Sequence, residues 1–209
     1  MNVHSVSVYS LEMEGKREIQ KRRTRERIVE HALRAFVDNG IETTNTARIA
    51  TAAGLSHGAI FVHFKTRQEV VMSVVEAFGA ELSERIEACV GRRQRLRSIL
   101  LAFVEALKPY ERFYTELLQI SSKLPKGVQG SLLMLQNGFS YFLLPAVERE
   151  VGKGRFERLK EAGVVNSWFA LLHYYLMNRD WYVEQGGVLE ELGPRIIDEY
   201  LALIDVEGT

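Results

Sequence analysis

The sequence predicts an all-α protein with a small N-terminal three-helix unit and a larger helical body. Apolar residues recur at three- and four-residue spacing through most of the 209 residues, which is typical of amphipathic helices. Strand-like alternation is almost absent, and the sequence contains four prolines. The stretch Ala53-Gly54-Leu55-Ser56 lies between two short helical patterns and predicts a tight turn between two helices.

The first helix is expected from about Arg22 to Asn39. Ile28 and Phe36 fall on one face at helical spacing, and Gly40 can end the helix in a left-handed cap. The segment before it, residues 1–15, reads as a flexible extension.

Two short helices should follow, joined by the turn. Thr44 or Asn45 can cap a helix over residues 46–53, because the side-chain oxygens of both accept hydrogen bonds from helix N-termini. Gly54 tolerates the positive φ that such a turn needs, and Ser56 can cap the next helix.

The body should begin with a long helix that starts after Thr66. Its apolar stripe runs from Val71 to Val90 and includes Cys89, which predicts a buried thiol. We therefore expect about nine helices, with a helix-turn-helix unit at residues 16–67 and a larger helical body at residues 68–209. The further helices are expected at residues 96–107, 113–118, 128–150 (kinked or ended at Pro145), 156–185 and after Gly193-Pro194.

Charge is distributed unevenly along the chain, although its formal net charge is zero. Residues 16–67 hold eleven Lys or Arg against five Asp or Glu, whereas residues 76–209 hold sixteen against nineteen. The N-terminal unit should therefore attract polyanions and the body should not.

Composition excludes several other classes. A single cysteine forms no intrachain disulfide, which favours a reducing cytoplasm. No apolar run is long enough to span a membrane, and the N-terminus does not read as a secretion signal. His57 and His63 lie six residues apart and lack the spacing of zinc ligands, so we expect no metal. No Gly-rich phosphate loop or nucleophile elbow appears, and we expect neither a cofactor nor an enzyme.

The segments TRERIVEHALRAFVDNGIETTN and TARIATAAGLSHGAIFVHFKTRQEVV, from Thr24 to Val75, resemble the DNA-binding domain of the TetR family of bacterial and archaeal transcriptional regulators. The likeness covers about fifty residues and is more specific than a bare helix-turn-helix. It implies that residues 16–67 are a helix-turn-helix DNA-binding domain and that residues 68–209 are a ligand-binding and dimerisation domain. It also implies a homodimer that pairs through the last two helices and places its two third helices in successive major grooves of double-stranded DNA. The residues that the resemblance assigns to DNA contact are Thr44, Asn45, Thr46, Arg48, Ser56, His57, Gly58, Ala59, Phe61, Val62, His63, Lys65, Thr66 and Arg67.

Two positions depart from the family pattern. The family usually has Tyr where Phe61 stands, and that hydroxyl often reaches a phosphate, a bond that Phe61 lacks. Val62 is less polar than the usual residue, which favours contact with a thymine methyl group. The basic run at residues 16–27 contacts the DNA backbone or minor groove, or else forms a solvated helix face.

The body contains an aromatic stretch, VVNSWFALLHYYLMNRDWYVEQ, at residues 164–185. A helix that is apolar all round is buried on all sides. The resemblance implies that the last two helices pack against their copies in the dimer, so part of this stretch should be interface. The remaining aromatics either pack as core or line a cavity for a small apolar or amphipathic effector of unknown identity. The candidate ligand-binding residues are Phe103, Phe113, Met134, Asn137, Phe139, Tyr141, Trp168, His173 and Met177.

These observations predict a homodimeric DNA-binding transcriptional regulator, a repressor released by a ligand, that recognises a palindromic operator through the helix at residues 57–63. One alternative is a helix-turn-helix protein whose body only dimerises or binds a protein partner. The other is a helical-bundle enzyme centred on His173. Sequence does not decide between a repressor and an activator.

Overall fold

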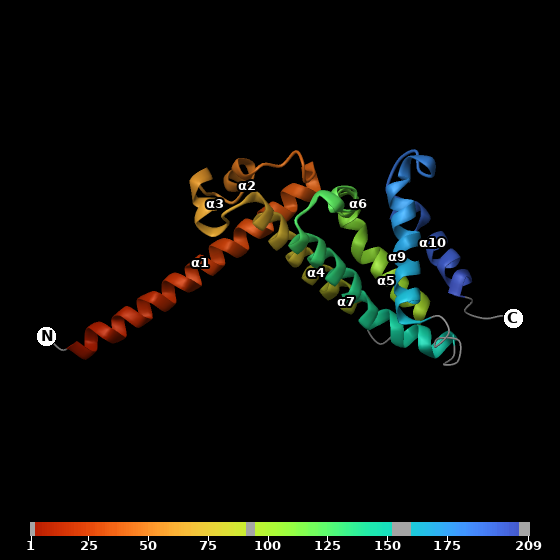
Figure 1. Cartoon of the computed structure of the whole chain (residues 1–209), viewed down its shortest axis with the longest axis horizontal. Helices are drawn as coiled ribbons and strands as arrows, with labels where there is room; N and C mark the ends of the chain where they lie inside the picture. The colour runs from red at the N-terminus through yellow and green to blue at the C-terminus, as the bar shows by residue number, and fades with distance from the viewer. Residues whose placement is uncertain (1–2, 91–94, 152–159, 205–209) are drawn as a thin grey trace. The chain divides into compact units, whose positions relative to one another are not determined.

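The computed structural model describes residues 3–90, 95–151 and 160–204, with side chains described for residues 15–89, 95–150 and 160–204. These residues are helical and contain no strand, as the sequence predicts (Figure 1). The chain divides into two compact units, Met1–Val74 and Val75–Thr209. The boundary falls inside helix α4 (Arg67–Val90), so one continuous helix belongs to both units.

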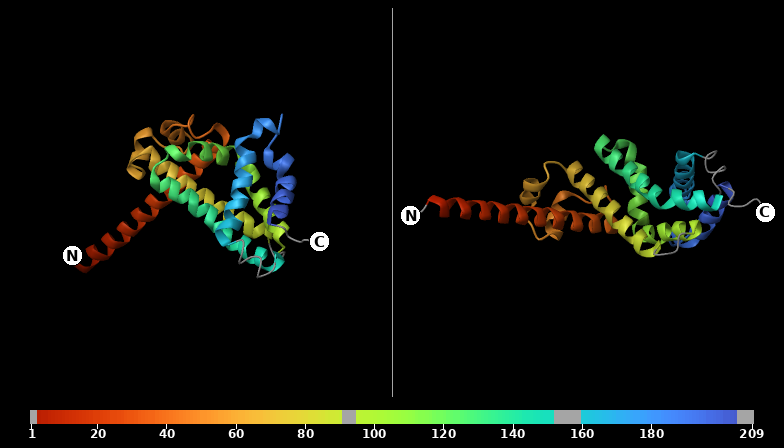
Figure 2. Two further views of the ribbon diagram at one scale, coloured as in Figure 1. Left: turned by 45° about the vertical axis from the view of Figure 1, so that its right-hand side comes forward. Right: turned by 90° about the horizontal axis from the view of Figure 1, so that it is seen from below.

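The first unit contains α1 (Val3–Asn39), α2 (Thr46–Ala52), α3 (His57–His63) and the start of α4. Helix α1 begins at Val3 rather than near Arg22, so it includes residues 3–15 that the sequence assigns to an extension. Its N-terminal half extends beyond α2 and α3 in each view (Figures 1 and 2). The buried core of the unit comprises Ile28, Ala32, Phe36, Ile41, Ile49, Ala50, Ile60, Phe64, Val70 and Val74.

The second unit is built around α5 (Leu96–Leu107), which packs against α7 (Lys126–Val151) and α10 (Val188–Ile204). Helix α9 (Glu161–Met177) contacts α7, α10 and α6 (Glu111–Ile120). Aromatic rings fill the centre: the Phe103 and Phe139 ring centroids lie 4.3 Å apart, and that of Trp168 lies 5.9 Å from that of Phe103.

Three expectations about the body are wrong in detail. The helix expected at residues 156–185 ends at Met177, followed by a 3₁₀ turn at Arg179–Trp181, while residues 152–159 lie outside the described residues. The last helix begins at Val188 and runs through Pro194. Cys89 is exposed rather than buried, although it lies at helical spacing from buried Leu82 and Ile86 near the end of α4.

A carboxylate from α6 explains the early start of α10. The backbone N–H groups of Val188 and Leu189 donate to the two Glu111 oxygens at 2.7 and 2.9 Å. The turn before the helix has room for this carboxylate because Gly187 has no side chain. A Cβ at this position would lie 2.9 Å from Glu111 Oε2. Glu111 therefore satisfies two donors that the first turn of a helix leaves free.

Replacing Glu111 by Ala should destabilise the second unit by about 1–3 kcal/mol, because two N–H groups at the α10 N-terminus lose a charged acceptor. Urea unfolding followed by circular dichroism measures the change. Glu87→Ala on the exposed face of α4 is the matched control and should change stability by less than about 0.5 kcal/mol. Equal stability of the two variants would contradict the capping role.

Candidate nucleic-acid interface and body cavities

Helices α2 and α3 are joined by the turn that the sequence predicts. Asn45, not Thr44, caps α2, because its side-chain oxygen accepts the Arg48 N–H at 2.9 Å. Gly54 has φ +67°, the left-handed conformation that favours glycine, and the Leu55 N–H donates to the Ala50 carbonyl at 2.9 Å. The turn thereby fixes the direction of α3 relative to α2.

Helix α3 has one buried and one exposed face. Ile60 is fully buried, and Phe64 is buried directly after the helix. Gly58 and Val62 lie on the opposite side, since successive residues turn by about 100° in a helix. The Val62 side chain is 71% exposed and that of Phe61 is 45% exposed, so the outward face is apolar.

The two histidines of α3 are held differently. His57 is exposed, its Nε2 lies 3.0 Å from Thr46 Oγ1, and its ring meets the Phe61 ring edge-on at 5.4 Å. His63 is half-buried, and its buried Nδ1 has no hydrogen-bond partner among the described residues. Burial, followed by the positive charges of Lys21 and Arg25, lowers the pKa of His63. This histidine is therefore mainly neutral at pH 7.

The segment between α3 and α4 is ordered by a reciprocal cap. The Glu69 N–H donates to Thr66 Oγ1 at 3.2 Å, and the Lys65 N–H donates to the Glu69 carboxylate at 2.8 Å. This arrangement resembles a capping box, in which side chain and backbone satisfy each other at a helix start. The Lys65 and Thr66 side chains remain exposed beside α3.

Two predicted contact residues hold the loop before α2 instead of facing outward. The Thr44 side chain is fully buried, and its hydroxyl donates to the Gly40 carbonyl at 2.7 Å. The Arg67 guanidinium donates to the Ile41 carbonyl and, at 3.4 Å, to the Thr44 carbonyl. Both side chains therefore position the loop, a role that residue type alone does not reveal.

The basic run at residues 16–27 also has mixed roles. Residues 15–23 are exposed along α1. Arg25 differs: its guanidinium donates to Ser73 Oγ at 2.7 Å and lies 4.2 Å from the centroid of the Phe64 ring. Arg25 thus links α1 to the start of α4, which sequence analysis missed because its neighbours are also basic.

The predicted DNA-contact residues that remain exposed form the candidate interface of the first unit. It combines cationic side chains at Arg48 and Lys65 with an apolar outward face on α3, and α1 adds further cations. Cations bind phosphates, while polar and apolar side chains read base edges. The predicted residues that remain exposed are Asn45, Arg48, Ser56, His57, Gly58, Phe61, Val62, Lys65 and Thr66, with Thr46, Ala59 and His63 half-buried.

In the body, eight of the nine predicted ligand-binding residues divide into two groups, and the ninth, His173, is half-buried. Phe103, Phe113, Phe139 and Trp168 are buried in the aromatic core. Met134, Asn137, Tyr141 and Met177 are exposed; Met134 and Tyr141 are 75% and 78% exposed. The helical spacing of these residues therefore does not distinguish side chains that are buried in the core from side chains that are exposed on the surface.

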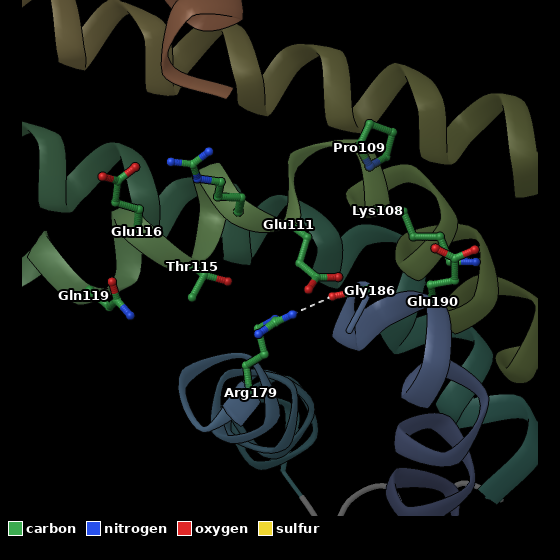
Figure 3. Close-up of a pocket in the computed structure, with 11 residues that line it drawn as sticks. Lys108, Pro109, Glu111, Thr115, Glu116, Gln119, Arg179, Gly186 and Glu190 are labelled. Carbon is green, nitrogen blue, oxygen red and sulfur yellow. Dashed lines mark hydrogen bonds between the residues drawn. The ribbon is translucent and has the colours of Figure 1, made fainter. Parts of the chain in front are cut away.

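Two cavities lie elsewhere in the second unit. One is a cleft of about 730 Å³, lined by polar side chains of α6 and by Arg179, which donates to the Gly186 carbonyl at 2.8 Å (Figure 3). It contains none of the predicted ligand-binding residues. The other is a groove of about 390 Å³ between α4 and α7, which includes Met134 among small residues such as Gly79 and Gly138.

His173 pairs with a phenol inside the body. Its Nε2 lies 2.8 Å from Tyr114 Oη, and burial lowers the pKa of His173 to about 4 and raises that of Tyr114. Nearby in the same core, the buried Trp168 Nε1 has no hydrogen-bond partner within the described part of the chain.

The described residues contain neither a metal-binding cluster nor a membrane-spanning helix. In that part of the chain, no group of three or more His, Cys, Asp or Glu side chains could hold a metal ion. No helix there is both long and apolar enough to cross a membrane.

Comparisons with known proteins place the first unit in a regulatory family. Residues 28–74 match the sequence profile described as bacterial regulatory proteins, tetR family. The uncharacterized HTH-type transcriptional regulator TtgW of Pseudomonas putida is 27% identical over 107 residues, 51% of this chain and 80% of TtgW. The HTH-type transcriptional regulator TtgR, also of Pseudomonas putida, is 41% identical over 54 residues, 26% of each chain. The match thus spans most of TtgW but about a quarter of TtgR.

The fold extends the likeness to both units. The structure of FadR from Thermus thermophilus, a TetR family transcriptional repressor in complex with lauroyl-CoA, aligns with a TM-score of 0.59 and 17% identity. The alignment covers 86% of this chain and 92% of FadR. At this identity the comparison concerns the fold alone.

Arg25→Ala should destabilise the first unit by about 1–3 kcal/mol, because it removes both the hydrogen bond to Ser73 and the cation–π contact with Phe64. Hydrogen exchange of the α3 amides measures the loss. The matched control is Arg22→Ala, whose exposed guanidinium lies 3.7 Å from the Glu26 carboxylate. Equal α3 protection in the two variants would rule out the structural role of Arg25.

His173 should make the body less stable in acid. Its pKa is near 6.5 when unfolded and about 4 when folded, so the unfolded state binds more protons as pH falls below about 6.5. Stability should drop by about 2 kcal/mol between pH 7 and pH 5, measured by urea unfolding. In His173→Gln, which keeps a hydrogen-bonding group but does not titrate, most of this drop should disappear. An unchanged pH dependence would contradict the assignment.

Proposed function

The chain is a transcriptional regulator of the tetR family, and on that premise we propose that it is a homodimeric repressor that leaves a palindromic operator when a small effector binds its body. The observation that carries the DNA-binding part is the exposed face of α3, supported on a buried core and flanked by cations. Such a surface suits a major groove, whose base edges lie between two rows of phosphates.

The proposed contacts fall into two classes. Arg48, Lys65 and the exposed basic residues of α1 bind phosphates, while α3 faces the bases through His57, Phe61 and Val62. The Thr44 and Arg67 side chains act indirectly, because their hydrogen bonds hold the loop that precedes α2.

Dimerisation through α9 and α10 is supported by an exposed stripe on α9. Asn166, Ala170, Tyr174 and Met177 are exposed at helical spacing, and Tyr174 and Met177 are 46% and 45% exposed. Leu203 on α10 is 62% exposed. Burial of this surface against a second copy would remove apolar side chains from water.

The effector is proposed to be apolar or amphipathic. The fold is shared with a repressor whose structure contains lauroyl-CoA, and the body of this chain has an aromatic core in which Trp168 Nε1 lacks an acceptor among the described residues. A ligand oxygen in this core could accept that hydrogen bond. Helix α4 would carry the response, because it belongs to both units. A shift from 1:99 to 99:1 between two states requires about 5.5 kcal/mol of differential binding.

A body that only dimerises is the second candidate. The tight packing of Phe103, Phe139 and Trp168 favours it, since these side chains contact each other rather than surround a cavity. A small molecule that releases the protein from its operator would exclude this alternative.

Selection of bound sequences from a random DNA pool, at low and high salt, tests the proposal. We expect enrichment of one palindrome and binding that weakens steeply with salt, because phosphate contacts release counterions. Lys65→Ala should reduce the slope of log affinity against log salt by about 1, whereas Lys123→Ala in the body should leave it unchanged. Weak binding without an enriched sequence would contradict the proposal.

A further inference from the structure

The outward face of α3 has no hydrogen-bonding side chain at its centre. Gly58 and Val62 occupy the two positions opposite buried Ile60, and a Cβ on Gly58 would contact nothing within 4 Å. Ala59 and Phe61 lie on either side of them. Four adjacent positions therefore present hydrogen atoms, methyl groups and an aromatic ring.

The hydrogen-bonding side chains of α3 lie at the edges of this face. His57 is engaged with Thr46 and packs against the Phe61 ring. His63 is half-buried with its Nδ1 directed inside. The side chains that commonly form a bidentate pair with a purine edge, arginine, lysine, asparagine and glutamine, are absent from residues 57–63.

An apolar face in a major groove has one complementary feature in unmodified DNA, the thymine 5-methyl group. We propose that α3 reads its operator by placing Val62 and Phe61 against thymine methyl groups, so that A·T pairs are specified at the centre of each half-site. This inference rests on the proposed function and specifies what α3 recognises.

The surrounding charges determine affinity rather than sequence in this scheme. Arg48 and Lys65 would contact phosphates, which fix the position of the protein and are the same for every sequence. A methyl contact releases no counterion. Discrimination between operators with and without the methyl group should therefore be independent of salt, although overall affinity falls as salt rises.

The experiment replaces each thymine of the selected operator, one at a time, by deoxyuridine, which lacks only the 5-methyl group. Wild-type protein should bind about fourfold more weakly at one or two positions per half-site, the equivalent of about 0.8 kcal/mol for one buried methyl group. The ratio should be the same at two salt concentrations. Thymines outside the half-sites are the DNA control.

Val62→Ala tests which side chain makes the contact. In this variant the ratio of affinities for the thymine and deoxyuridine operators should fall toward one at the affected position. Thr51→Ala, on the exposed face of α2, should keep the wild-type ratio. The measurement on wild-type protein does not depend on the variant folding.

The outcomes separate the inference from the proposed function. Specific binding to a selected palindrome with no deoxyuridine penalty at any position would overturn thymine readout and leave the regulator intact. A penalty unchanged in Val62→Ala would overturn the role of Val62. Absence of any selected sequence would overturn the proposed function, and this inference with it.

Discussion

Burial of Ile60 and Phe64 is the constraint on which the proposed DNA-reading surface depends. Helix α3 has seven residues, and isolated helices shorter than about 12–15 residues are marginal in water. Its outward face therefore exists because its inward face packs in the core of the first unit. The Arg25 guanidinium lies over the Phe64 ring and donates a hydrogen bond to Ser73 Oγ, which ties α1 and α4 together beside the same core. Recognition and stability are consequently linked through these residues.

Polar groups from distant parts of the chain fix helix ends in both units. Glu111 caps α10, and the Glu150 carboxylate accepts the Leu96 N–H at 2.7 Å at the start of α5. In the first unit, Arg67 binds carbonyls of the loop before α2. Two of these contacts place surfaces that we propose to be functional: the Glu111 contact positions α10 of the dimer stripe, and the Arg67 contacts position the loop before α2 and α3.

The fold was predictable where local chemistry dominates. Gly54, Asn45 and Thr66 act through the backbone within a few residues, so the turn and these caps could be predicted, the α2 cap as either Thr44 or Asn45. The role of Glu111, which acts on α10 from 77 residues away, could not. The internal contacts of Arg25 and Arg67 could not be predicted either, because sequence does not show which arginine finds an internal acceptor. The burial of the body aromatics could not be predicted from spacing either, because Tyr141 and Phe139 lie on the same helix and differ in what packs on each face.

The central claim is that two copies of α3, placed by the dimer, read two half-sites in successive major grooves. Hydroxyl-radical footprinting of the selected operator tests this claim most directly. We expect two protected patches on one face of the duplex, separated by about one helical turn of 10–10.5 base pairs. A single protected patch, or protection without a two-fold arrangement, would contradict the account.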